Sequence, residues 1–380
     1  MDLSLVIIVL LVVILGFVII FGRPKPNDKN DANTALNDSS SQNTESGFSS
    51  TSSSSSSGSS NSLLSQLSMI NARNFPALSK NQLPNKLTAF FGRKDIILDV
   101  MGRSWESGGP ICLYGEKGNG KSSLAIELAH QLAPKYPDAQ FYFDFSGRGD
   151  RPLPISKAMG HILRAFFPKE PLPGDPEQLI HEYGEAIKGK RILMLIENVS
   201  NPSQIKRLMV GKSGLLIFTS AEKIITPGAY TKPVKEFFPD EAELLLFFYA
   251  SHAKRWATDI NELCGYSPLA IALAASYLKS NPDIAVETFV REFREEKRLM
   301  KPEGDSETND DKNKKEIIDR NVEPIFNMIF RDMRKETATV FRKLALFASS
   351  FDAKAAAGIS GDRDGDHLRR LMDLKLIEYD

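Results

Sequence analysis

The sequence predicts an α/β fold in which a parallel sheet is covered by helices on both faces and is followed by a helical region. Two observations support this fold class. Between residues 83 and 221, apolar runs of strand length alternate with patterns of helical period, and beyond residue 235 helical patterns dominate. The expected strands are 110–114, 140–145, 191–196 and 214–219, and helices are expected at 124–132 and 155–167.

A further helix within the sheet region is expected to follow Asp175. Asp175 is a favourable N-cap, Pro176 suits the first helical position, and Gln178 can complete a capping box. Beyond the sheet, helices are expected at 240–253, 260–263, 269–278 and 286–300. A charged break covers 301–315, and the last segment, 321–380, is expected to form short helices that end in a strand at 376–379.

Length and composition limit the classes of function. The chain has 380 residues, of which 42% are hydrophobic, enough for two or three domains with their own cores. Its 48 basic and 48 acidic residues balance, which argues against a global field that gathers nucleic acid or coats a membrane surface. Cys112 and Cys264 lie far apart in apolar segments, so we expect reduced, buried thiols and neither a disulfide nor a metal site.

Residues 1–23 are predicted to form a transmembrane anchor. The run from Leu3 to Phe21 is apolar apart from one serine and one glycine, and at roughly 1.5 Å per residue it spans the bilayer core of about 30 Å. A cleaved signal peptide is the alternative, but it would have positive charge before a shorter apolar core. Because Arg23 and Lys25 follow the run, we expect a single-pass membrane protein with its N-terminus outside or luminal and its remaining domains cytosolic.

Residues 24–82 are predicted to be a disordered, serine-rich linker. From Pro24 to about Ser62 the sequence consists almost entirely of small and polar residues, including the serine run 52–57. Such a segment has too little apolar surface to fold, and as a flexible coil it would reach about 30 to 40 Å from the membrane. Phosphorylation of these serines is left open.

Residues 115–122 match the phosphate-binding pattern G-x-x-x-x-G-K-[ST], between a predicted strand and a predicted helix. The glycines allow a tight turn whose N–H groups, together with the helix N-terminus, face the phosphates. Lys121 is expected to reach the β and γ phosphates, and the Ser122 hydroxyl to ligate Mg²⁺. The sequence therefore predicts a P-loop NTPase that binds ADP or ATP. The nucleotide-binding residues predicted from the motif are Gly115, Gly118, Asn119, Gly120, Lys121, Ser122 and Ser123.

Such a site also needs an acid at the end of a neighbouring strand, which holds Mg²⁺. The buried strand 191–196 leads to Glu197 at this position, where an aspartate is more usual. A charged residue that merely ends a strand is the alternative interpretation. Asn198 then stands where a second acid would often orient the attacking water. Because an amide cannot accept a proton, we expect hydrolysis to be slow, with Glu197 and Asn198 as the candidate catalytic residues.

The order of these segments resembles the NB-ARC group of STAND ATPases, which act as nucleotide switches. The resemblance covers most of 83–380. Its F-x-G-R loop is similar to Phe90–Arg93, its sensor strand to 215–221, and its G-x-P-L-A motif to Gly265–Ala270. It implies that Phe91, Gly92 and Arg93 lie near the adenine, that Pro268 contacts bound ADP, and that 237–248 begins a helical domain.

The same resemblance implies a winged helix at the end of the chain, from Leu344–Phe347 onward. The chain ends at Asp380, inside the implied wing hairpin, as expected of a short gene product or of a fragment. Ala221 replaces the arginine that senses the γ-phosphate in the family, so sensing and hydrolysis depart from its pattern. The implied domains are 83–235 (nucleotide-binding), 236–300 (helical, ARC1-like), 301–320 (charged linker) and 321–380 (winged-helix-like).

Residues 367–370, His-Leu-Arg-Arg, lie on the implied recognition helix, where basic side chains can bind DNA. A solvated face of a helix that only packs is the alternative we favour, and nucleic acid is not an expected partner. We expect a membrane-anchored nucleotide switch that regulates signalling, with a homo-oligomer and an unidentified protein partner left open. An AAA+ motor and a DNA-binding initiator-like ATPase are the alternatives.

Overall fold

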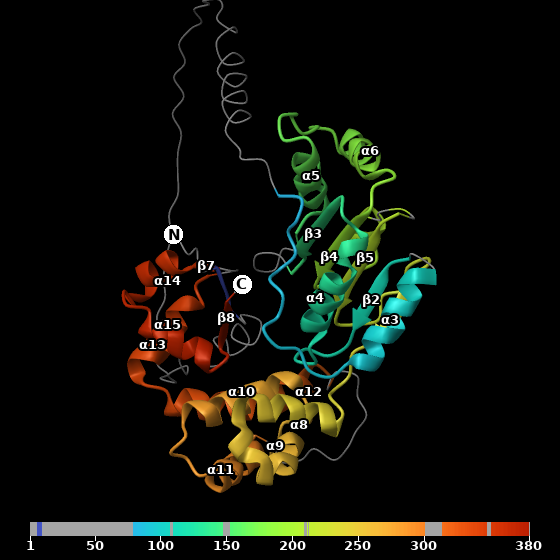
Figure 1. Ribbon diagram of the computed structural model, residues 1–380. Coiled ribbons are helices and arrows are strands. Elements are labelled where there is room, and N and C mark those ends of the chain that lie inside the picture. Colours follow the sequence, from blue (N-terminus) through green and yellow to red (C-terminus); the bar gives the residue numbers. More distant parts are fainter. Residues whose placement is uncertain are drawn as a thin grey trace, which may run out of the picture.

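The structure is a computed structural model that describes residues 6–9, 79–106, 109–146, 153–208, 211, 213–300, 314–347 and 351–379. Figure 1 shows a sheet with its covering helices, a layer of helices at one end of the sheet, and a small region that contains β7, β8 and α13 to α15. Most of the predicted linker lies outside the described residues.

The sheet has five strands in the order β3-β4-β5-β2-β6, and all neighbours run parallel. The strands are β2 (Ile111–Tyr114), β3 (Ala139–Asp144), β4 (Ile192–Glu197), β5 (Leu215–Ser220) and β6 (Tyr230–Pro233). This confirms the predicted fold class and four predicted strands. Every residue of β4 and β5 is buried, which requires cover on both faces and explains why their sequences are continuously apolar.

Helices cover the two faces of the sheet (Figure 1). One face packs against α3 (Lys94–Glu106) and α4 (Lys121–Leu132), and the other against α5 (Ile155–Phe166) and α6 (Pro176–Ile187). Short helical turns, η1 (Ala133–Lys135) and α7 (Ser203–Lys206), follow α4 and β4. Successive side chains of β4 point to opposite faces of the sheet. Leu193 and Leu195 pack against α4, whereas Met194 and Ile196 pack against α5.

The predicted N-cap of α6 is present. The backbone N–H of Gln178 donates to Asp175 Oδ2 at 2.8 Å, and Pro176 occupies the first turn. The Gln178 side chain donates to Glu182 instead of returning to the backbone of Asp175. The helix therefore has a side-chain cap at its start and an i,i+4 pair on its surface.

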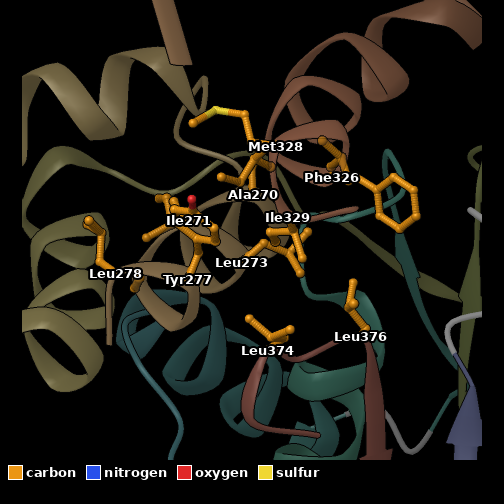
Figure 2. Packing of buried hydrophobic residues seen from close by; sticks show 14 of the residues in the cluster. Ala270, Ile271, Leu273, Tyr277, Leu278, Phe326, Met328, Ile329, Leu374 and Leu376 are labelled. Carbon is orange, nitrogen blue, oxygen red and sulfur yellow. The ribbon is translucent and has the colours of Figure 1, made fainter. Parts of the chain in front are cut away.

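The remaining helices share one hydrophobic core. They are α8 (Pro239–Ala250), η2 (Ser251–Trp256), α9 (Ala257–Leu263), α10 (Pro268–Ser280), α11 (Val286–Leu299), α12 (Lys314–Asp332), α13 (Lys335–Leu344), α14 (Ala353–Ser360) and α15 (Asp366–Asp373). Figure 2 shows Ile271, Leu273 and Tyr277 of α10 with Phe326 and Ile329 of α12 and with Leu374 and Leu376, which precede β8 (Ile377–Tyr379). The C-terminal region is thus joined to the helical region by continuous apolar packing.

The N-terminal segment differs from the expected transmembrane helix over the residues described. Val6–Val9 forms strand β1, which pairs antiparallel with β7 (Phe351–Asp352) and β8. Four β-branched residues favour an extended strand when neighbouring edges offer backbone partners. Within the described residues, no helix has both the length and the apolarity that a membrane span requires. The rest of the apolar run lies outside the described residues.

The basic residues of α15 make contacts within the protein. Both terminal nitrogens of Arg370 donate to the Ser280 carbonyl at 3.3 Å, which joins α15 to the end of α10. Arg369 pairs with Asp366, and His367 Nδ1 lies 2.9 Å from the Thr337 hydroxyl. These contacts favour the packing interpretation of this helix over a DNA-reading one.

Candidate nucleotide-binding site

The P-loop connects the end of β2 to the start of α4. Gly115, Gly118 and Gly120 all have positive φ, a conformation that glycine adopts without strain. At Gly115 a Cβ would lie 2.3 Å from the Val234 carbonyl oxygen, so a side chain cannot fit there. Gly120 is the N-cap of α4 and carries no side chain to cap it, which leaves the first N–H groups of the helix available to an anion.

Lys121 is held at the mouth of this loop. Its Nζ donates to the Glu116 carbonyl at 2.7 Å, so the side chain folds back over the loop. Burial lowers the pKa of Lys121 to about 8, and attraction to Glu197 raises it in part. A phosphate bound here would favour the charged form and would offset the burial.

Glu197 ends β4 on the same face as α4 and is only 7% exposed. Burial raises its pKa to about 7, and repulsion from Asp144 adds to this, whereas the hydroxyls of Ser122 and Tyr142 and the charge of Lys121 lower it. Its Oε1 is buried without a hydrogen-bond partner among the described residues. Buried polar atoms are rarely left unpaired.

This orphaned oxygen fits a divalent cation. Mg²⁺ is usually held by one or two protein oxygens together with substrate phosphates and water. Ser122 and Glu197 are the protein oxygens that would hold it, as the sequence predicts. No group of three or more His, Cys, Asp or Glu side chains in the described part of the chain could hold a metal ion without such help.

Asn198 and Asp144 lie together beyond the ends of β4 and β3. Asn198 has φ 57°, its backbone N–H donates to Thr219 Oγ1 at 3.1 Å, and its Nδ2 donates to Asp144 Oδ1 at 2.8 Å. Asp144 pairs with Glu197 in the register of the sheet. Sequence reasoning did not select Asp144, although an acid inside the last predicted residues of strand 140–145 was a visible signal. Ala221 follows β5 and is exposed.

The start of α10 lies directly on the P-loop. The backbone N–H of Leu269 donates to the Gly118 carbonyl at 3.2 Å, and a Cβ on Gly120 would lie 4.0 Å from Pro268 Cγ. A Cβ on Gly118 would come within 3.2 Å of Ser267 Oγ. The predicted ADP contact, Pro268, is therefore a neighbour of the phosphate loop, although it lies 148 positions after Gly120 in the sequence.

Arg93 joins the loop before α3 to both the P-loop and the start of α8. It is 5% exposed, and its guanidinium donates to the carbonyls of Asn119 at 3.1 Å, Glu236 at 3.3 Å and Lys235. Its backbone N–H donates to the Glu241 carboxylate. Burial lowers the pKa of Arg93, while Glu241 and Glu236 oppose the shift. Arg93 therefore contacts the backbone of the P-loop itself.

The two residues before Arg93 contact the helical region. A Cβ on Gly92, whose φ is +66°, would clash with the Glu241 side chain. The ring of Phe91 lies 5.0 Å from that of Phe248 on α8. The loop before α3 therefore contacts the P-loop through Arg93 and contacts α8 through Phe91. Its expected contact with adenine stays a prediction.

Two curated proteins are similar to this chain in sequence, and a solved structure is similar to it in fold, over most of its length. No protein-family model matches. Regulatory protein AfsR of Streptomyces griseus is 28% identical over 318 residues, which cover 79% of this chain and 31% of that protein. Regulatory protein AfsR of Streptomyces coelicolor is 28% identical over 320 residues, with 78% and 31% covered. The chain therefore spans about a third of the length of the curated relatives it matches.

A solved structure shows the same fold. The Signal Transduction ATPase with Numerous Domains (STAND) protein with a tetratricopeptide repeat sensor from Pyrococcus horikoshii gives a TM-score of 0.53 at 15% identity. The match covers 79% of this chain and 41% of that chain. The shared fold is a P-loop NTPase sheet followed by helices, as the sequence predicts.

Proposed function

We propose that this protein is a nucleotide-dependent regulatory switch of the STAND class, close to the NB-ARC group, that binds ADP or ATP with Mg²⁺. The observation that carries the proposal is the double contact of the P-loop with the helical region. Gly118 accepts a hydrogen bond from Leu269 of α10, and Asn119 accepts one from Arg93, which also binds Glu241 of α8. A change at the phosphates therefore acts on groups that hold the helical region.

In this proposal, bound ADP holds the sheet and the helical region together, and exchange for ATP shifts the balance toward a looser arrangement. The regulatory relatives and the STAND fold support a switch. Ala221 replaces the arginine that senses the γ-phosphate in the NB-ARC group, and Asn198 replaces a second acid. Both replacements support slow hydrolysis of ATP. Membrane anchoring by the apolar run, a cytosolic location of the folded part, and self-association belong to the same proposal.

Nucleotide retained by the purified protein tests it. Lys121→Ala removes the cation that the motif directs to the phosphates, and we expect it to abolish the ADP or ATP that heat denaturation releases for chromatography. Lys117→Ala removes an exposed cation from the same loop and should retain near wild-type nucleotide. Equal release from wild type and Lys121→Ala would refute the assignment.

A further inference from the structure

The chain joins the sheet along the outer edge of β3. The N–H of Gln140 donates to the Lys80 carbonyl at 2.6 Å, and the Gln140 carbonyl accepts from the Gln82 N–H at 2.8 Å, in a parallel arrangement. Lys80 Nζ lies 4.9 Å from the centre of the Phe166 ring, at the end of α5. The part of the chain that precedes this pairing therefore arrives beside the end of α5 (Figure 1).

A groove with a volume of about 520 Å³ lies between the end of α5 and the outer face of α6. This volume falls within the range of about 300 to 1,000 Å³ that is usual for binding pockets. Phe167 lines the groove and is 40% exposed, and its ring lies 6.5 Å from that of Phe166. The groove therefore begins one aromatic ring away from the point where the chain arrives. Its other apolar lining residues are Leu163, Pro171, Leu172, Pro173 and Ala186.

The charged residues that line this groove are all acidic: Glu170, Glu182 and Glu185. Glu185 pairs with Lys188 at 3.1 Å, and Glu182 accepts from the Gln178 side chain at 2.8 Å. Among the residues that the structure describes, neither Glu170 nor Glu182 pairs with a cation. The groove therefore combines an apolar floor with two carboxylates that are not neutralised, and it is complementary to an apolar segment that carries one positive charge.

The sequence directly before the point of entry has this composition. Residues 62–78 include seven large apolar residues, whereas residues 39–61 include one, Phe48. Arg73 is the only charged residue of the segment 62–78. The seven apolar residues are Leu63, Leu64, Leu67, Met69, Ile70, Phe75 and Leu78.

The length of chain between this arginine and the sheet also fits. Arg73 lies six positions before Ser79, and six residues of extended chain reach about 20 Å. The part of α6 that lines the groove, from Gln178 to Glu185, is about 10 Å long. Arg73 can therefore reach the carboxylates of the groove from the place where the chain meets α5.

We propose that residues 62–78 bind in the groove between α5 and α6, with their apolar side chains on its floor and Arg73 beside Glu170 and Glu182. Burial of apolar surface drives the binding, and the guanidinium fixes the position of the segment along the groove, because it forms directional hydrogen bonds with carboxylates. The inference goes beyond the proposed function, since it involves neither nucleotide nor Mg²⁺. Its consequence is that the free serine-rich tether ends near residue 61, where the chain is attached to the β3 side of the sheet.

Crosslinking between introduced cysteines in the full chain tests the proposal. Asn74→Cys places a thiol next to Arg73, Gln178→Cys places one in the groove, and the two native cysteines are buried. A short bis-maleimide should join this pair within one chain about tenfold faster than it joins Asn74→Cys to Lys157→Cys, because binding raises the effective concentration of the first pair. Lys157 is the matched control: it is exposed and outside the groove, about 14 Å along α5 from Phe166, and so within reach of the tether.

Charge reversal tests the part played by the arginine. Glu170→Lys combined with Glu182→Lys should slow the crosslinking of the groove pair about fivefold, because two like charges then face Arg73. Adding Arg73→Glu should bring the rate back to within about twofold of its original value. A double reversal without effect, or one that Arg73→Glu does not correct, would overturn the proposal.

Limited trypsin cleavage gives a second measurement on the chain without added cysteines. Within residues 30–79, Arg73 is the only lysine or arginine, so a fragment that ends there reports this site alone. Cleavage after Arg73 in the full chain should be about tenfold slower than in a synthetic peptide of residues 62–79, because a bound segment must open before it is cut. Phe167→Ser should remove this protection, whereas Phe238→Ser, which changes a more exposed phenylalanine at the start of α8, should not.

The outcomes separate the possible occupants of the groove. Equal crosslinking of the two cysteine pairs, or cleavage of the wild type as fast as of the peptide, would overturn the proposal. Crosslinks that join two chains and depend on protein concentration would overturn it in favour of a second copy in the groove. Thermal melting should show that all variants fold. Retention of nucleotide should be the same in all of them, so failure of this proposal would leave the proposed function intact.

Discussion

Replacing Glu197 with glutamine should stabilise the protein in the absence of nucleotide and magnesium, and weaken binding of the magnesium complex. Glu197 has a pKa of about 7 in the folded state against an ordinary value of 4.5, because burial disfavours its charge. The folded state therefore binds the proton more tightly than the unfolded state. The stability that this group contributes is fully present below pH 4.5 and is lost as the pH rises through 7.

The size of the effect follows from the two pKa values. A tenfold difference in proton affinity corresponds to about 1.4 kcal/mol, so the buried carboxylate costs about 3 kcal/mol at pH 8 and about 1 kcal/mol at pH 5. Glutamine carries no charge and avoids this cost. Because Lys121 loses an attractive neighbour in the variant, we expect a net gain of about 2 kcal/mol at pH 8.

Denaturation of wild type and Glu197→Gln in the presence of a chelator, at pH 5 and pH 8, measures this gain. The difference between the two proteins should be larger at pH 8 by roughly 2 kcal/mol, and Glu170→Gln, an exposed glutamate, should show no such dependence. Addition of ADP with Mg²⁺ should raise the melting temperature of wild type more than that of the variant. A stability difference that is the same at both pH values would refute the reasoning.

Three further predictions concern other parts of the chain. Arg93→Ala should destabilise the protein by about 3 kcal/mol in chemical denaturation, because three backbone carbonyls, of which that of Asn119 is buried, lose a charged donor, and a loss below about 1 kcal/mol would contradict this. Asp175→Ala should cost about 1 kcal/mol through the N-cap of α6, with Asp175→Asn as the control that keeps the cap. The apolar run 3–21 should retain the full chain in membranes after carbonate extraction, because a span of this length is held by the bilayer core. Release into the soluble fraction would favour the β1 pairing of Val6–Val9 instead.

The sequence predicted those parts of the fold where one physical requirement dominates. Strand β4 is buried at every residue, so its apolar run could not belong to a surface segment. The P-loop needs glycine at fixed positions, and the three positive φ values show why. Strand β6, Tyr230–Pro233, was missed because all four residues are half-buried and include a lysine and a proline, which are depleted in strands.

The residues of the P-loop motif could be predicted from the sequence. Contacts between residues from different strands and loops could be predicted less well. Glu197 could be placed because its strand is apolar up to that residue. Asp144 could not, because its partners Glu197 and Asn198 come from another strand, and the register that joins them is set by the packed sheet. Arg93 was predicted beside the adenine, but its contacts with Asn119 and Glu241 depend on the turn at Gly92 and on the position of α8.

The shared core of α8 to α15 has a mechanical consequence. Side chains from α10, α12 and the residues before β8 fill one apolar interior, so these elements cannot slide past one another without opening voids. These helices form one packed unit. Leu269 of this unit donates a hydrogen bond to Gly118 of the phosphate loop, and the strands β7 and β8 of the unit belong to the β7-β1-β8 sheet. A displacement of the phosphate loop therefore cannot be absorbed by one helix of this core alone: either all of these helices move together, or the hydrogen bond from Leu269 to Gly118 breaks.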